Sequence, residues 1–157
     1  MADTSLTILK SRVSVSDNPE RTLGYSHKFN VKFSDIACGT GNSDTVTLTL
    51  GNTPKNWMVT RAIVNVVTAF AGTTSFNIIV GSTTGTSAFV ASASTLAQGL
   101  IQNTTGPNTT GTIASSTGSA SVVYKAIFTN ATGGSPSALT AGELNIYLNV
   151  IDLDQMP

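Results

Sequence analysis

The sequence predicts an all-β protein, an antiparallel two-sheet sandwich that is jelly-roll-like and carries an extended N-terminal arm. Apolar and polar residues alternate with period two along most of the chain, which is typical of strands with one buried face. Turn signals separate these runs at intervals of roughly 8 to 15 residues, and no parallel β-α-β unit is recognisable. Only 10% of the residues are charged, and the Thr, Ser, Asn and Gly that replace them suit strands and turns.

The first 20 residues differ from the rest. Leu6 and Ile8 alternate in one register, Val13 and Val15 in the other, and "SDNPE" then interrupts the chain. We therefore expect residues 1–20 to form an extended arm that pairs with a sheet edge in its own subunit or in a neighbour. Residues 21–157 should form one β-sandwich domain, because 157 residues suffice for a single core but are too few for two.

Four runs predict amphipathic strands. "YSHKFNVKFS" (25–34) places its aromatic residues, His27 and Val31 on one face, and "TVTLTL" (45–50) ends at the turn "GNTP". "SVVYKAIF" (121–128) and "ELNIYLNVIDL" (143–153) alternate in the same way. Together with the segment described next, these runs predict a core containing Val46, Leu48, Leu50, Val64, Val66, Ile78, Val80, Leu144, Ile146 and Leu148.

The most apolar stretch is "WMVTRAIVNVVTAF", residues 57–70. A membrane helix needs about 20 consecutive apolar residues, whereas this run is shorter and contains Arg61. Apolar residues occupy both of its faces, which predicts a central strand covered on both sides. The turn "AGTTS" should join it in a hairpin to "FNIIVG" (76–81).

Three less regular segments follow. In "SAFVASASTLAQGLI" (87–101) the spacing of Phe89, Leu96 and Leu100 would suit a short helix, although the central Ser and Thr weaken that interpretation. Residues 102–120 predict a low-complexity loop with a strand at Thr112 to Ala114, and "TNATGGSPSALTAG" (129–142) predicts a second long turn.

No catalytic residue, cofactor or metal is predicted, and we expect a protein that is not an enzyme. The phosphate-binding glycine loop, the nucleophile elbow and the zinc-ligand cluster are all missing from the sequence. His27, the one histidine, lies on an apolar strand face eight positions from Asp35; Asp17 or Asp44 could still approach it in the fold. We interpret it as a hydrogen-bonded rim residue and not as a general base.

The remaining candidates also favour structural roles. Asp152 and Asp154 supply two of the six or more ligands that calcium needs, and Glu20 and Glu143 do not suggest the carboxylate pair of a glycosidase. Cys38 is expected to be an inert buried thiol, and Trp57 a core or interface residue in preference to a platform for sugars. The sequons at Asn103, Asn108 and Asn130 are attributed to a Ser/Thr/Asn-rich composition.

Charge restricts the partners. The formal net charge is zero, so neither a polyphosphate track nor a basic membrane patch can be assembled, and we expect neither nucleic acid nor membrane as a partner. No signal-like segment begins the sequence. A surface this poor in charge also favours self-association, which predicts a homo-oligomer.

Three stretches carry a resemblance to a known family. They are "GYSHKFNVKFSDIACGTGNSDTVTLTLG", "NWMVTRAIVNVVTAFAGTTSFNIIVGSTTGTSAFVAS" and "VVYKAIFTNATGGSPSALTAGELNIYLNVIDL". In these the chain resembles the small all-β auxiliary (decoration or cement) virion proteins of tailed bacteriophages. The resemblance covers most of the chain after residue 24.

The resemblance implies a non-enzymatic jelly-roll subunit, commonly a trimer, that binds the major capsid protein and stabilises the phage head. Its location would be the outer surface of the virion head, after synthesis in the host cytoplasm. The alternative is a head-fibre or tail-associated β-sandwich that binds a receptor or carbohydrate, with loop residues such as Trp57, Asn103 and Asn108 meeting sugars.

Overall fold

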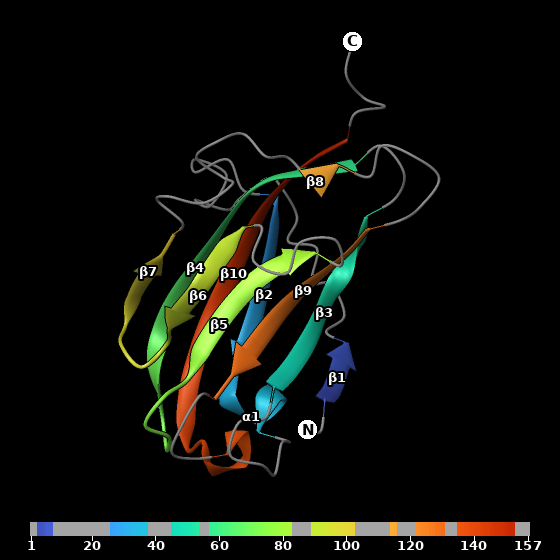
Figure 1. Ribbon diagram of the computed structural model, residues 1–157. Helices are drawn as coiled ribbons and strands as arrows, with labels where there is room; N and C mark the ends of the chain where they lie inside the picture. Colours follow the sequence, from blue (N-terminus) through green and yellow to red (C-terminus); the bar gives the residue numbers. More distant parts are fainter. Residues whose placement is uncertain are drawn as a thin grey trace.

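The computed structural model describes residues 3–7, 26–37, 45–53, 57–82, 89–102, 114–115, 122–130 and 135–152. Its strands are β1 (Asp3–Thr7), β2 (His27–Lys32), β3 (Thr45–Thr53), β4 (Trp57–Ala71), β5 (Asn77–Ser82), β6 (Val90–Ser94), β7 (Gly99–Ile101), β8 (Ala114–Ser115), β9 (Val122–Thr129) and β10 (Ala141–Asp152). Short helical turns form α1 (Phe33–Ile36) and the 3₁₀ helix η2 (Pro136–Ala138). Figure 1 shows these elements in the fold.

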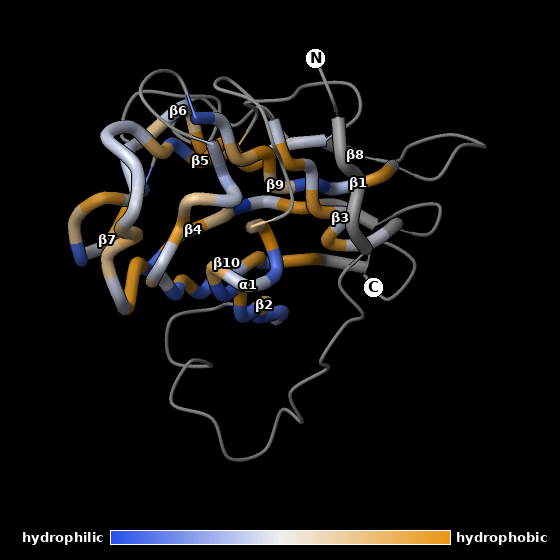
Figure 2. Tube along the Cα trace, turned by 90° about the horizontal axis from the view of Figure 1, so that it is seen from below, coloured by the Kyte–Doolittle hydropathy of each residue, from blue (hydrophilic) through white to orange (hydrophobic). Residues whose placement is uncertain are grey.

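The strands form two layers, which Figure 2 shows end-on. Sheet A has the order β1-β3-β9-β5-β6, and sheet B has the order β2-β10-β4-β7, with β8 also pairing with β4. All pairs are antiparallel except β1 with β3, which is parallel. The predicted all-β two-sheet sandwich is therefore confirmed.

The strand pairing is that of a jelly roll. With β1 and β8 set aside, the first described strand pairs with the last (β2 with β10) and the second with the next to last (β3 with β9). The next pairs inward are β4 with β7 and β5 with β6. This is the connectivity of one long hairpin wrapped into two sheets, which distinguishes a jelly roll from other sandwiches.

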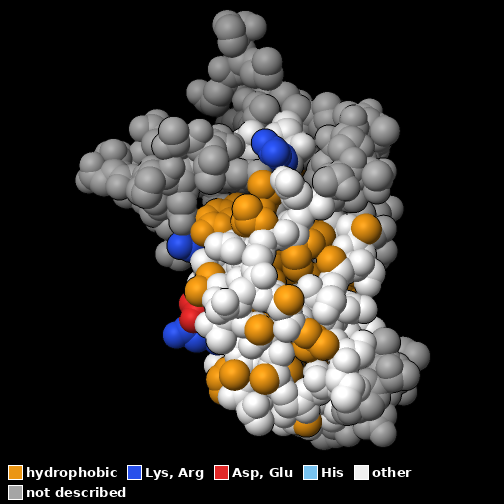
Figure 3. All heavy atoms as spheres, turned by 90° about the vertical axis from the view of Figure 1, so that its left-hand side faces the viewer, with side chains coloured by type: hydrophobic (Ala, Val, Ile, Leu, Met, Phe, Trp, Pro, Cys, Tyr) orange, Lys and Arg blue, Asp and Glu red, His pale blue; other side chains and the backbone are white. Residues whose placement is uncertain are grey.

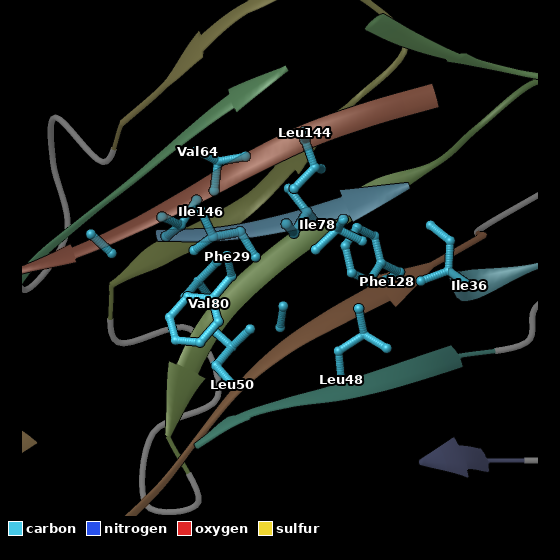
Figure 4. Close-up of a cluster of buried hydrophobic side chains, with 14 of the residues drawn as sticks. Phe29, Ile36, Leu48, Leu50, Val64, Ile78, Val80, Phe128, Leu144 and Ile146 are labelled. Atoms are coloured by element: carbon cyan, nitrogen blue, oxygen red, sulfur yellow. The ribbon is translucent and has the colours of Figure 1, made fainter. Parts of the chain in front are cut away.

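Alternation places the apolar side chains between the sheets. Figure 4 shows Phe29, Val64, Leu144 and Ile146 of sheet B pointing toward the labelled side chains of sheet A, with Ile36 of α1 beside them. All ten residues predicted for the core are buried, each with 3% or less of its surface exposed. Burying an aliphatic side chain of this size contributes about 1.5 to 3 kcal/mol.

Three phenylalanines join the sheets at the end of the sandwich where β4 passes to β5. The ring of Phe70, on β4, lies 5.4 Å from that of Phe76 and 6.4 Å from that of Phe128, measured between centroids. The rings of Phe76 and Phe128 are stacked at 5.7 Å. All three are 2% exposed or less, so this end of the core is closed by aromatic packing.

The hairpin predicted between residues 57–70 and 76–81 is wrong. β4 pairs with strands of sheet B, whereas β5 pairs with β9 and β6 of sheet A, so the turn between them crosses from one sheet to the other. Gly72 makes this crossing feasible, because its φ of +102° is one that L side chains rarely adopt and a Cβ there would lie 2.0 Å from the carbonyl oxygen of Ala138.

The prediction that the 57–70 strand is covered on both sides is also wrong. β4 does lie inside sheet B, between β10 and β7, but its second face is open, with Val67 41% exposed. The register shift between Asn149 and Val150 of β10 leaves Thr60 of β4 without a partner in register, which marks a bulge in β4 at Thr60. The bulge turns Val59 to the same buried side as Ala62.

The short helix that the spacing in 87–101 would suit does not form. Strands β6 and β7 occupy the segment, with Thr95 to Gln98 between them. Phe89 is buried but Leu100 is 67% exposed, so the three apolar residues do not share one buried face. The segment contains β-branched and small residues, and it lies beside strand edges of β5 and β4 that would otherwise be unpaired. Both features favour strands over a helix here.

Two strands end at other residues than predicted. β2 stops at Lys32, whose backbone N–H donates to the carboxylate of Asp35 at 2.8 Å, and this bond starts α1 where a continued strand was expected. β3 runs beyond Leu50 to Thr53, because a bulge at Gly51, with φ of +148°, carries it through the expected turn.

The arm and the loops are described only in part. β1 pairs with β3 of the same chain at the edge of sheet A, while residues 8–25 lie outside the described residues, so the boundary at residue 20 stays a prediction. The strand expected at 112–114 overlaps β8 at Ala114 alone. η2 lies within the predicted long turn 129–142.

Candidate functional site

His27 and Asp35 are kept apart by the strand that separates them. His27 is the first residue of β2, half-buried, with its Nδ1 2.9 Å from the hydroxyl of Ser26. Asp35 lies in α1, beyond the other end of β2, and the five strand steps from His27 to Lys32 alone span about 16 Å. Its carboxylate accepts the backbone N–H of Lys32. His27 is thus a hydrogen-bonded residue on a strand, as predicted, and Asp35 starts a helix.

For most of the other candidate residues named from the sequence, the side chain lies outside the part of the chain that the structure describes. Trp57 and Asp152 are register partners at the ends of β4 and β10, but their side chains lie outside the described part. Asp17, Glu20, Cys38, Asp44, Asn103, Asn108 and Asp154 also lie outside the described residues. Asn130 is fully buried, so in this fold its sequon offers no accessible amide to a glycan.

A row of asparagines crosses the outer face of sheet B. The register places Asn30 of β2 opposite Asn145 of β10, and Asn145 opposite Asn65 of β4. The Asn30 amide donates to the Asn145 side-chain oxygen at 2.9 Å and to the Glu143 carboxylate at 2.7 Å. Asn145 is 8% exposed. We call Asn30, Asn145 and Asn65 the asparagine row, a line of amides held in place by the strands and by each other.

Charged and aromatic groups flank the asparagine row. Lys28 lies with its ammonium 5.7 Å from the centroid of the Tyr147 ring, a cation–π contact, and Tyr147 is opposite Ile63. On the other flank Lys32 pairs in register with Glu143. With the exposed Arg61 of β4, these residues give sheet B a polar, charged outer face, and Figure 2 shows the hydrophilic colour concentrated at β2.

The outer face of sheet A is different in character. Its half-buried positions are Thr45, Thr47 and Thr49 of β3, Val123, Lys125, Ile127 and Thr129 of β9, and Asn77 and Ile79 of β5. Ile127 lies between Thr47 and Ile79 in register. Lys125 is the one charged side chain that the structure describes on these strands. We call this surface the threonine face.

The side of the sandwich formed by β6 and β7 is held firmly to β4 and β5. Thr95, fully buried between the two strands, donates both its N–H (2.9 Å) and its hydroxyl (3.0 Å) to the carbonyl of Phe76. Its own carbonyl accepts the N–H of Phe70 at 3.0 Å. The Gln98 side chain donates to the Val67 carbonyl at 2.8 Å. Backbone from both sheets is therefore tied together at this corner.

Nothing in the described part of the chain assembles a reaction centre. There, no group of three or more His, Cys, Asp or Glu residues could hold a metal ion, and no helix is both long and apolar enough to span a membrane. What the described residues do assemble is two flat sheet faces of contrasting chemistry. Sequence reasoning missed the asparagine row: the sequence shows an Asn at an outward position in each of three strands, but only the register of the strands brings the three together.

Comparison with known proteins adds little. No protein-family model matches the chain, and no curated protein sequence matches it. Among solved structures, the chain has a weak match to the crystal structure of Aeromonas hydrophila PliG, described as a periplasmic lysozyme inhibitor of g-type lysozyme. That similarity has a TM-score of 0.35 and 13% sequence identity, and it covers 96% of this chain and 100% of the other. A TM-score this low supports no argument about function.

Proposed function

We propose that this chain is a non-enzymatic structural protein of a bacteriophage virion, a decoration or cement protein that binds the major capsid protein on the outside of the head and stabilises it. The resemblance of the sequence supports this role, and so does the jelly-roll topology. The observation that carries the proposal furthest is the threonine face, a broad sheet surface on which Lys125 is the one charged side chain among the described residues.

The threonine face suits a capsid contact because covering it leaves few charges to desolvate. Removing charged groups from water is costly, and the outer face of sheet B would present four charged side chains, those of Lys28, Lys32, Arg61 and Glu143. Threonine hydroxyls can satisfy polar groups of a partner while Ile79 and Ile127 supply apolar area. Each contact can be weak, since one oligomer would make several at once through effective concentration.

The test is titration of the protein onto undecorated heads at low and high salt, with occupancy and the melting temperature of the heads as readouts. An uncharged interface should tolerate salt, whereas a charge-steered one weakens as ionic strength rises. Saturable, salt-tolerant binding that raises the melting temperature of the heads is expected. No binding, or binding abolished by moderate salt, would refute the proposal.

A matched pair of variants locates the contact. Ile127→Glu places a charge in the middle of the threonine face, and Ile63→Glu places the same charge in the middle of the outer face of sheet B, at a position of similar partial burial. Both should lower stability to a similar degree. We expect only Ile127→Glu to abolish head binding; the opposite result would assign the contact to sheet B.

The asparagine row favours a second candidate, the head-fibre or tail-associated sandwich that binds a carbohydrate or receptor. Fixed amides hydrogen-bond well to sugar hydroxyls, and Tyr147 supplies a ring beside them. A glycan array probed with the protein tests this candidate. Binding to a glycan that is lost in Asn145→Ala, with head binding unchanged, would favour it over a purely structural role for this face.

A further inference from the structure

The β6–β7 side of the sandwich contrasts with the opposite edge of sheet B. Edge strands offer unpaired backbone groups, and proteins commonly protect them with outward charges, lysine above all. β2, at one edge of sheet B, carries Lys28 and Lys32. Residues 89–102, which include the edge strands β6 and β7, contain no charged residue and no proline. This edge therefore lacks the usual protection against pairing with another strand.

Among the residues that the structure describes, the two large hydrophobic side chains that are exposed both lie on this side. Leu100, on β7, is 67% exposed, and Val67, on the neighbouring β4, is 41% exposed. Leu100 is opposite Asn65 in register, so Val67 is its diagonal neighbour on the outer face. Figure 3 looks onto this side and shows hydrophobic side chains distributed over it, with Lys, Arg, Asp and Glu toward the top and one margin.

Gly99 leaves the β7 backbone open to a close approach. A Cβ built at this residue meets no atom of the described residues within 4 Å, so the described part of the chain leaves the space above it open. Glycine in a strand often marks a place where another backbone comes near. The bonds made by Thr95 and Gln98 hold the segment in shape, and a preformed edge loses little conformational entropy on binding.

We propose that the β6–β7 side is the surface through which copies of this chain associate, with Leu100 at its centre. A second copy fits for two reasons. Antiparallel pairing of identical edges is self-complementary, since each strand supplies the donors and acceptors that the other needs. The side is also uncharged on both partners, so two copies meet without like-charge repulsion, and a chain of zero net charge is not kept apart by its overall field. This interface is separate from the threonine face and does not depend on the head contact.

The test is the mass of the full-length protein by sedimentation velocity, from low to high micromolar concentration, for the wild type, Leu100→Glu and Ser34→Glu. Leu100→Glu puts a charge into the proposed contact. Ser34→Glu puts the same charge on α1, at an exposed residue that follows the opposite edge strand. Circular dichroism checks that each variant keeps its strands, and the high exposure of Leu100 means that folding should survive.

We expect the wild type and Ser34→Glu to sediment as the same oligomer, and Leu100→Glu to dissociate with an affinity lowered at least about tenfold. A wild type that is monomeric throughout, a Leu100→Glu oligomer of unchanged affinity, or equal dissociation of both variants would each overturn the proposal. If the wild type is monomeric and Leu100→Glu abolishes its binding to heads, the β6–β7 side would instead be assigned to the contact with the capsid. Failure of head binding with the oligomer intact would count against the proposed function and leave this inference standing.

Discussion

Two glycines with almost the same φ allow the packing of the core to be tested separately from the strain that a positive φ imposes on other residues. Gly142, on β10, has φ of +143° and Gly99, on β7, has φ of +140°. A Cβ added at Gly142 would fall 2.3 Å from Cδ1 of Phe70, whereas one added at Gly99 meets nothing within 4 Å. Replacing either glycine by alanine strains the backbone in the same way, but only the alanine at position 142 clashes with a core side chain.

The expected magnitudes follow from these distances. A non-glycine residue held in this region of φ loses about 1 to 3 kcal/mol, and both variants share that loss. Carbon atoms pack best at about 3.5 to 4.0 Å, so the Phe70 ring must shift by more than about 1 Å in Gly142→Ala. Phe70 is 2% exposed and packs on Phe76 and Phe128. Such overpacking should lower the free energy of unfolding by about 1 to 3 kcal/mol more.

The assay is urea unfolding followed by circular dichroism, with both substitutions made in the Leu100→Glu background so that self-association does not enter. Gly142→Ala should be less stable than Gly99→Ala by about 1 to 3 kcal/mol, which corresponds to a melting temperature lower by roughly 2 to 12 °C. Equal stabilities would show that the Phe70 ring moves aside freely, and the account of a closed aromatic end would then be wrong.

Three further predictions address buried polar groups and the arm. Asn130→Leu should raise the free energy of unfolding by about 1 to 3 kcal/mol in urea titrations, because the side chain is fully buried and neither of its polar atoms has a hydrogen-bond partner among the described residues; a loss of stability would reveal a partner for the amide. Thr95→Val should lower it by about 0.5 to 1.5 kcal/mol through loss of the hydroxyl bond to Phe76, and no change would mean that the backbone N–H alone suffices. Removal of residues 1–20 should leave the strand signal in circular dichroism intact but weaken assembly on heads, since it deletes β1 from the edge of sheet A; equally tight binding by the truncated protein would dismiss a role for the arm.

The core was predictable because a period of two leaves little choice of face. Val46, Leu48 and Leu50 alternate with threonines, and only one register buries all three. The fold class followed from the same alternation. Which strands pair, however, depends on contacts far apart in sequence, and "AGTTS" looks the same whether the chain turns back within one sheet or crosses to the other.

The errors have local physical causes. The outer face of β4 appeared to need a cover because Ile63 and Val67 are apolar, yet a sheet face can leave single apolar residues in solvent. Residues 87–101 were ambiguous because the spacing of Phe89, Leu96 and Leu100 suited a short helix while the central Ser and Thr did not. The unpaired edge of β4 favoured a strand. The asparagine row could have been inferred only with the register of β2, β10 and β4 in hand, since the three residues are spread from position 30 to position 145.

The place of β10 between β2 and β4 determines when this protein can fold. Because His27 pairs with Leu148, and Trp57 with Asp152, β2 cannot join β4 in sheet B until β10, which lies far along the sequence, has been synthesised. Pairing between strands that are far apart in sequence slows folding, and until β10 is available the partly synthesised chain exposes strand edges and apolar faces. A nascent chain halted before Ala141 has β2 without a neighbour in sheet B. It should be cut by proteases as readily as an unfolded polypeptide, and release of the last strand from the ribosome should coincide with the onset of resistance.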